Sequence, residues 1–96
     1  MLYTLSHSPT QCDLSALLRL MLEGDALLLM QDGVLAGMAG STYLELLLFS
    51  VPISLYALQD DLEARGLVGF FSHKITIIGY NHFIELTEKH HSQMAW

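Results

Sequence analysis

The sequence predicts a single α/β domain in which a mainly parallel sheet of about four strands lies between helices, in three layers. Its 96 residues suffice for one core, so we expect residues 1–96 to form one domain. Segments with strand composition alternate with segments of helical periodicity, which implies right-handed crossovers between parallel strands. The apolar run Ala26–Met30 is typical of a strand covered on both faces, as in parallel sheets.

The first predicted strand is Met1–Leu5, which Ser8-Pro9 ends because proline restricts its predecessor and has no amide hydrogen. A helix follows, with Asp13 as its N-cap and Gly24 as its C-terminal stop. Its apolar residues recur at i, i+3, i+4 and i+7: Leu14, Leu17, Leu18 and Met21. The chain therefore begins with a strand and an amphipathic helix.

The second predicted strand is Asp25–Met30. The next segment, Val34–Gly40, mixes apolar residues with glycine and is predicted to be a loop. Thr42 and Glu45 form a capping-box pair, which predicts a short helix that ends before Pro52.

The third predicted strand is Ile53–Leu58. Asp60 and Glu63 form another capping-box pair, and Gly66 is a helix stop, so a short helix follows this strand.

The last predicted strand is the β-branched segment Ile75–Tyr80. Asn81 is the expected N-cap of a final helix, whose apolar residues are Phe83, Ile84 and Leu86. We expect the tail, Ser92–Trp96, to be separate from these elements.

The composition predicts a permanent partner. Apolar residues other than glycine make up 52% of the chain and charged residues 15%, compared with averages of about 45–50% with glycine included and about 25%. A domain of this size hides only about 60–65% of its unfolded surface. Apolar surface should therefore remain exposed on a monomer, and an interface would cover it.

The charge and the cysteine content limit the functional classes. The formal net charge is −6 without any Lys/Arg cluster, which argues against direct nucleic-acid binding. No apolar run approaches the ~20 residues that span a bilayer, and the N-terminal residues lack the features of a signal peptide. One cysteine cannot form an internal disulfide, which fits a reducing compartment. We therefore expect a cytoplasmic protein without membrane contact.

Cys12 is the one candidate thiolate nucleophile. A helix N-terminus can lower the pKa of a thiol, but the negative charge of Asp13 opposes thiolate formation. No Lys or Arg lies within six residues. The interpretation as a structural cysteine is favoured, and we predict no catalytic residue in this chain.

Other polar residues do not form a recognisable cofactor site. The histidines lack zinc-ligand spacing, so we predict neither a metal nor a cofactor. The carboxylates of Asp60, Asp61 and Glu63 are explained by their position at a helix N-terminus. The glycines at 33, 37 and 40 match no phosphate-binding fingerprint and predict a flexible or tightly packed loop, although a small-molecule site there remains open.

The C-terminal residues predict an interface. Trp96, behind Met94, is a large aromatic residue on a tail, and aromatic and Met residues are enriched in interfaces. We expect Met94 and Trp96 to dock into a groove of this subunit or of a neighbouring one.

Seven ordered segments together resemble the TusB/DsrH family over the whole chain. None of them is a catalytic motif, and their order and the terminal Gln-Met-Ala-Trp give the resemblance its specificity. The segments are His7-Ser8-Pro9, Glu23-Gly24-Asp25, Leu27–Leu29, Gln31–Val34, Tyr56–Leu58, Asp61–Gly66 and Ser92–Trp96.

This resemblance implies a DsrEFH-like α/β domain and membership in a sulfur-relay complex. TusC-like and TusD-like subunits would join the chain in a heterohexamer, a dimer of trimers. The complex would pass persulfide sulfur from TusA to TusE for 2-thiolation of wobble uridine in tRNA. In the family the active cysteine belongs to the D subunit, so this chain would be no enzyme by itself.

One branch of the family, DsrH, carries a cysteine well inside the first helix. The matching region holds Leu17 and Leu18 here, and Cys12 lies more than a helical turn earlier. The role of that thiol is therefore not transferred to Cys12. The alternative hypothesis is that Cys12 itself carries a persulfide.

Overall fold

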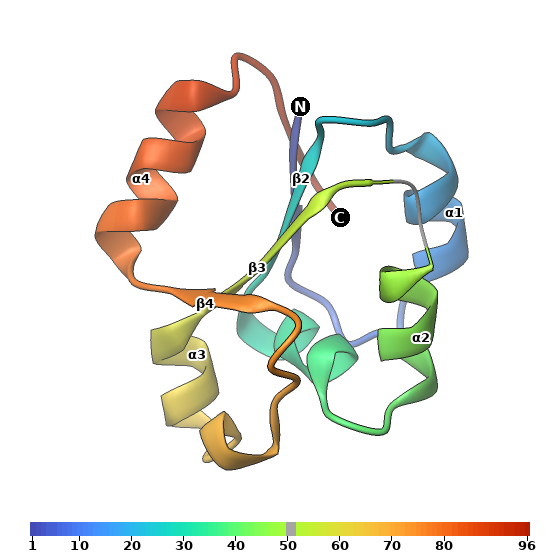
Figure 1. Ribbon diagram of the computed structural model, residues 1–96, viewed down its shortest axis with the longest axis vertical. Coiled ribbons are helices and arrows are strands. Elements are labelled where there is room, and N and C mark those ends of the chain that lie inside the picture. Colours follow the sequence, from blue (N-terminus) through green and yellow to red (C-terminus); the bar gives the residue numbers. More distant parts are fainter. Residues whose placement is uncertain (50–51) are drawn as a thin grey trace.

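Five parallel strands form one sheet in the computed structural model, which describes residues 1–49 and 52–96 (Figure 1). The strands are β1 (Leu2–Leu5), β2 (Ala26–Leu29), β3 (Ser54–Leu58), β4 (Thr76–Ile78) and β5 (Gln93–Ala95), in the spatial order β4-β3-β2-β1-β5. Every neighbouring pair is parallel. The predicted α/β class with a parallel sheet is confirmed, and the sheet has one strand more than expected.

The helices lie on both faces of the sheet. They are α1 (Leu14–Leu20), α2 (Thr42–Leu48), α3 (Gln59–Ala64) and α4 (Tyr80–Lys89), with 3₁₀ helices η1 (Gln31–Gly37) and η2 (Val68–Phe70). Figure 1 shows α1 and α2 on one side of the sheet and α4 on the other. The connections from β1 to β4 all step across the sheet in one direction, whereas the connection through α4 returns from edge strand β4 to edge strand β5. Because crossovers between parallel strands are right-handed, this reversal places α4 on the face opposite to α1 and α2.

The central strand β2 is buried along its whole length, and its side chains alternate between two cores. Leu27 and Leu29 belong to the larger cluster, together with residues from α1, α2, η1 and α3. Ala26 and Leu28 face the smaller cluster, which includes Leu86 of α4. A strand with apolar contacts on both faces explains the uninterrupted apolar run in the sequence.

Two helix ends were predicted correctly. Asp13 is the N-cap of α1, and its carboxylate accepts a hydrogen bond of 3.0 Å from the amide of Ala16. Gly66 follows α3 with φ +66°, and the amide of Leu67 donates to the carbonyl of Leu62 in the manner of a Schellman motif.

Three predicted N-caps were wrong by one or two residues. Ser41, not Thr42, caps α2, because its hydroxyl accepts a hydrogen bond from the amide of Tyr43. Leu58 and Gly79 occupy the N-cap positions of α3 and α4 and provide no side-chain hydrogen bond. Strands β3 and β4 run almost directly into these helices, so the predicted caps Asp60 and Asn81 fall within the first turn.

The predicted loop Val34–Gly40 is largely helical, because η1 continues to Gly37. Gly33 and Gly37 are buried, and each permits a close approach. A Cβ at Gly33 would overlap the carbonyl oxygen of Leu5, and one at Gly37 would overlap the ring of Phe71. Tight packing, one of the two readings of this segment, thus explains both glycines.

The tail is not a separate segment. Residues 93–95 form β5, which pairs with β1 in the register Tyr3↔Met94 and Thr4↔Ala95. The amide of Trp96 donates to the carbonyl of Thr4 at 2.7 Å, and the amide of Ser6 donates to the carbonyl of Trp96 at 3.2 Å. The prediction failed because three exposed residues carry no apolar alternation that would indicate a strand.

Among the helices of the described residues, none has both the length and the apolar composition needed to cross a bilayer.

Candidate functional site

Cys12 lies in the loop between β1 and α1, directly before the helix cap. The loop is folded on itself: the amide of Gln11 donates to the carbonyl of Ser8 at 2.9 Å, and the hydroxyls of Ser8 and Thr10 lie 2.9 Å apart. The thiol is partly buried and packs against the larger core cluster. The fold therefore holds Cys12 partly buried, directly before the first turn of α1.

The surroundings of Cys12 disfavour its thiolate. Burial raises the pKa of the thiol, and the neighbouring negative charge of Asp13 raises it further. A reactive cysteine needs the opposite environment, because the thiolate is the nucleophile and positive charge stabilises it. Both effects on the pKa of Cys12 therefore oppose formation of its thiolate.

The side chain of Trp96 is partly buried and packs against the larger core cluster of its own chain. His7 reinforces this position, since its Nδ1 lies 3.3 Å from the carbonyl oxygen of Trp96. Met94 stays exposed on the edge strand. The role of Met94 and Trp96 in a contact between subunits stays a prediction.

The acidic residues near α3 join it to η1. The Asp61 carboxylate accepts a 2.8 Å hydrogen bond from the amide of Gln31, a residue with a φ of +50°. Arg65 forms ion pairs with Asp32 at 3.0 Å and with Asp61 at 3.6 Å. These contacts give Asp32 and Asp61 a structural purpose. Glu63 accepts a 2.8 Å hydrogen bond from the side-chain amide of Gln59, and Asp60 remains exposed.

The histidines are dispersed over the surface, and across residues 1–49 and 52–96 no three His, Cys, Asp or Glu side chains are grouped to hold a metal ion. The expectation that the chain uses no metal stays a prediction.

Asp25 is a buried charge that the sequence analysis did not single out. Its carboxylate accepts a 2.9 Å hydrogen bond from the amide of Leu22 and lies 2.9 Å from the terminal ammonium of Met1. Burial by itself would raise the pKa of Asp25, but the hydrogen bonds from Leu22 and Met1 and the charge of Met1 hold it below its ordinary value. The position of Asp25 directly before the fully apolar strand β2 could have predicted a buried charge.

We expect Asp25→Asn to lower the free energy of unfolding by about 1–3 kcal/mol at pH 7, since a buried charge-assisted contact is lost. The folded-state pKa of Asp25 is depressed, so its contribution is present above the unfolded-state pKa of about 4 and is lost as pH falls through the folded-state value. Urea unfolding of wild type and variant at several pH values measures this. The difference should shrink below about pH 4, and Glu88→Gln on the exposed face of α4 should show no such loss.

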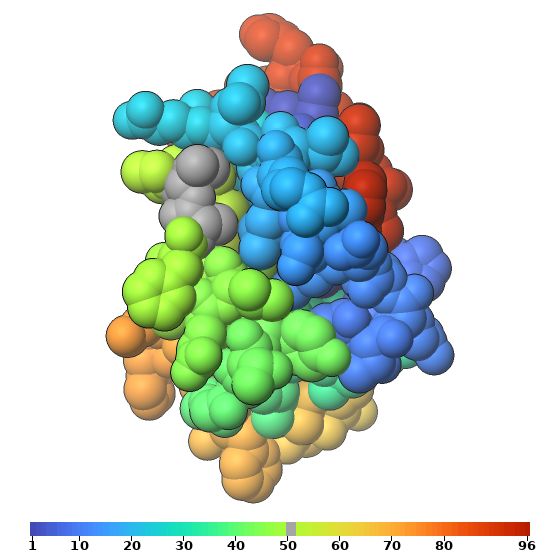
Figure 2. Space-filling model, turned by 90° about the vertical axis from the view of Figure 1, so that its right-hand side faces the viewer, coloured from blue at the N-terminus to red at the C-terminus, as the bar shows by residue number. Residues whose placement is uncertain are grey.

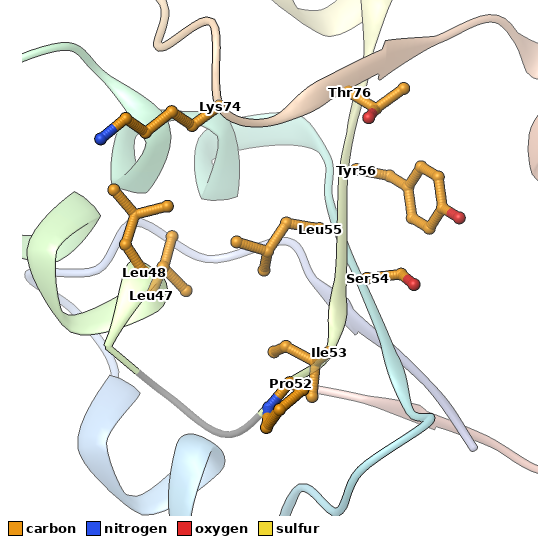
Figure 3. Close-up of a pocket in the computed structure, with 9 residues that line it drawn as sticks. All are labelled: Leu47, Leu48, Pro52, Ile53, Ser54, Leu55, Tyr56, Lys74 and Thr76. Atoms are coloured by element: carbon orange, nitrogen blue, oxygen red, sulfur yellow. The ribbon is translucent and has the colours of Figure 1, made fainter.

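A hollow of about 370 Å³ lies beside β3 (Figure 3). Strand β4 pairs only with the second half of β3, from Tyr56 onward, so the first half is open at this edge. Figure 3 shows Tyr56, Ser54 and Thr76 pointing to one side of β3, while Lys74 lies on the other side. The polar side chains do not converge, and the hollow therefore lacks the arrangement of a catalytic site.

A larger groove of about 700 Å³ separates α1 and α2 on the face that Figure 2 shows, with α1 in blue and α2 in green. Its apolar walls come from Leu18, Leu46 and Phe49, and its charged residues are Arg19 and Glu45. Phe49 is 88% exposed, the largest exposed fraction among the described large apolar residues. An apolar groove with a charged margin has the composition of an interface.

The fold and these surfaces define a small parallel α/β domain whose one thiol has a raised pKa and whose apolar side chains are partly exposed. The chain belongs to the family described as DsrH like protein, whose sequence profile matches residues 7–93. The recognition of the TusB/DsrH family is thereby confirmed.

Curated relatives agree with this assignment. The chain is 80% identical to Protein TusB of Serratia proteamaculans (strain 568) and 56% identical to Protein TusB of Yersinia pestis (strain Pestoides F). Both alignments cover all 96 residues of this chain and 100% of the relative. The solution NMR structure of protein Tm0979 from Thermotoga maritima matches with a TM-score of 0.64 and 24% identity, covering 96% of this chain and 97% of that one. This last likeness supports the fold alone.

Proposed function

We propose that this chain is a non-catalytic subunit of a cytoplasmic sulfur-relay complex that serves the 2-thiolation of wobble uridine in tRNA. In this complex it joins TusC-like and TusD-like subunits in a heterohexamer, a dimer of trimers. The complex takes persulfide sulfur from TusA and passes it to TusE. The observation that carries the proposal is the 80% identity to a TusB protein over the full length of both chains.

The surroundings of the thiol support the proposal that this subunit is not catalytic. A persulfide carrier must present a thiolate to the sulfur donor, and both burial and Asp13 raise the pKa of Cys12. The chain then has a structural role through its contacts with the other subunits, and the cysteine that transfers sulfur belongs to the D-type subunit.

The partners are proteins rather than nucleic acid. A formal net charge of −6 opposes the tRNA phosphates, so the chain reaches tRNA only through the later members of the relay. Met94 on the outer edge strand, with Trp96 behind it, is the proposed point at which a related subunit contacts this chain.

Replacing Cys12 by serine is expected to leave tRNA thiolation unchanged. Cells that lack the natural copy would receive either wild type or Cys12→Ser, and mass spectrometry of tRNA nucleosides would measure 2-thiouridine. Both should restore it, whereas an empty vector should not. Loss of 2-thiouridine in the variant, together with a gain of about 32 Da on wild-type Cys12 after exposure to a sulfur donor, would establish the alternative in which Cys12 carries a persulfide.

Native mass spectrometry of the co-expressed subunits tests the assembly itself. One complex with equal numbers of the three chains is expected. A chain that stays apart from C-type and D-type subunits contradicts the proposal.

A further inference from the structure

Titratable groups from three parts of the chain meet at the end of the sheet where its strands begin. The ammonium of Met1 lies 2.9 Å from the carboxylate of Asp25, directly before β2. The amide of Leu2 donates to the carbonyl of Ser92 at 3.0 Å, and this contact brings the segment that follows α4 beside the N-terminus (Figure 1). His90, the C-cap of α4, begins that segment. The α-amino group, Asp25 and His90 therefore share this end of the sheet.

Asp25 and its neighbours connect the starts of β1, β2 and β3. The carbonyl of Asp25 accepts a hydrogen bond from the amide of Ser54 at 3.1 Å, and the amide of Ala26 donates to the carbonyl of Met1 at 3.1 Å. The side chain of Asp25 is 12% exposed, so water solvates its charge poorly. Removing one partner of such a pair is destabilising, because the other charge is left without compensation. The contacts between these strand ends therefore depend on the charge of Met1.

His90 is a second group that can carry a positive charge near Asp25. Burial lowers the pKa of His90, the positive charges of Met1 and Lys89 lower it further, and the negative charge of Asp25 opposes them. Tyr3 also senses this carboxylate, since burial and then the charge of Asp25 raise its pKa. The ammonium of Met1 forms the ion pair with Asp25, and its charge disfavours a second cation at His90.

An acyl group on Met1 removes the charge on which this arrangement depends. Formyl is the acyl group with which bacterial protein synthesis starts a chain. A formamide nitrogen keeps one hydrogen that can donate to Asp25, but it has no positive charge. Hydrolysis restores the amine: water breaks the bond between the formyl carbon and the nitrogen, the oxygen of the water leaves in formate, and its two hydrogens complete the ammonium.

We propose that the α-amino group of Met1 is a modification-sensitive site, at which the fold requires a free ammonium beside Asp25. With N-formyl-Met1 the Asp25 carboxylate loses its ion pair, the contacts between β1, β2 and β3 weaken, and His90 becomes the substitute cation. A hydrolytic deformylation therefore precedes the fully stable state of the domain. This inference goes beyond the proposed function, since it concerns the N-terminus and requires no sulfur chemistry.

The position of Cys12 permits a direct test on the full chain. Native chemical ligation joins a synthetic thioester of residues 1–11 to a segment that begins with Cys12, and it leaves a natural peptide bond. Three products then differ only at Met1, which carries a free amine, an N-formyl group or an N-methyl group. The N-methyl group is similar in size to formyl but leaves the nitrogen positively charged, so it is the matched control.

Urea unfolding compares the three chains. The N-formyl chain is expected to have a folding equilibrium constant lower than that of the free chain by about tenfold or more, because a charge-assisted contact is lost. The N-methyl chain should stay within about twofold of the free chain, because its ion pair persists. An N-formyl chain as stable as the free chain, or an N-methyl chain as unstable as the N-formyl chain, overturns the inference.

The titration of His90 gives a readout that a loss of packing alone would not move. In the N-formyl chain the positive charge of Met1 no longer disfavours the imidazolium, so the pKa of His90 should be higher than in the free chain. In the N-methyl chain it should match the free chain. NMR spectroscopy of the imidazole ring measures this in the wild-type sequence. A pKa of His90 that is the same in all three chains contradicts the role of His90 as substitute cation.

Asp25→Asn identifies the partner of the terminal charge. Without the carboxylate, the free and N-formyl chains should differ by less than about twofold in their folding equilibrium constants. Glu23→Gln removes an exposed carboxylate from the same loop, and formylation should still cost about tenfold there. If formylation harms Asp25→Asn as much as wild type, the formyl group acts by its bulk, and the inference fails.

Discussion

Gly33→Ala is expected to lower the free energy of unfolding by ~3 kcal/mol or more, because the new methyl group would overlap the carbonyl of Leu5. That carbonyl is backbone in the middle of the fold and accepts a hydrogen bond from the amide of Met30 at 3.0 Å. It cannot rotate away as a side chain does. Strand β1 and helix η1 must therefore separate, and their buried contacts weaken together.

Urea denaturation of three glycine variants measures this effect. Gly69→Ala is the control, because a Cβ there meets no atom within 4 Å and the backbone is not left-handed. Gly37→Ala should fall between the two, since its clash is with the ring of Phe71 and a ring can shift. Adding Phe71→Leu should recover part of the loss at Gly37 and none at Gly33. A Gly33→Ala protein as stable as the Gly69→Ala protein contradicts the close approach.

The sequence predicts an element well where the signal is local. The spacing of Leu14 and Leu17 and the cap at Asp13 lie within one helix, and the structure agrees with both. The run Ala26–Leu29 indicated a doubly covered strand, and it is the centre of the sheet. These signals depend on a residue and its near neighbours along the chain.

Prediction failed where distant parts of the chain decide the structure. Residues 93–95 form a strand only because β1 offers an open edge. Helix η1 owes its packing to Leu5 and Phe71, which lie far from Gly33 and Gly37 in the sequence. Residues so distant in the sequence leave no local pattern. The composition of Val34–Gly40 could therefore predict only a tightly packed or flexible segment.

The same division applies to the candidate site. The poor surroundings of Cys12 were predictable because Asp13 is adjacent, and the raised pKa of the thiol agrees. The ion pair of Asp25 with Met1 spans 24 residues, and the groove is lined by residues from two separate helices, among them Arg19 of α1 and Glu45 of α2. The excess of apolar residues predicted exposed apolar surface, but only the packing of α1 and α2 shows that Leu46 and Phe49 are part of it.

Truncation after Ser92 is expected to cost about 3–5 kcal/mol, the second large effect in this domain. It removes the parallel ladder between β5 and β1, including the 2.7 Å hydrogen bond from the amide of Trp96 to Thr4. It also removes the indole that packs against the larger core cluster. Strand β1 then becomes an apolar edge strand, which favours aggregation.

Two single substitutions divide that loss between side chain and backbone. Trp96→Ala keeps the ladder and should lose only the packing of the indole, roughly half of the total. Met94→Ala removes an exposed side chain and should cost less than about 1 kcal/mol. Thermal unfolding at low protein concentration, with light scattering to detect aggregates, measures all three variants. If truncation proves no more harmful than Met94→Ala, the tail is not part of the sheet, and an open β1 edge is the ordinary state of the domain.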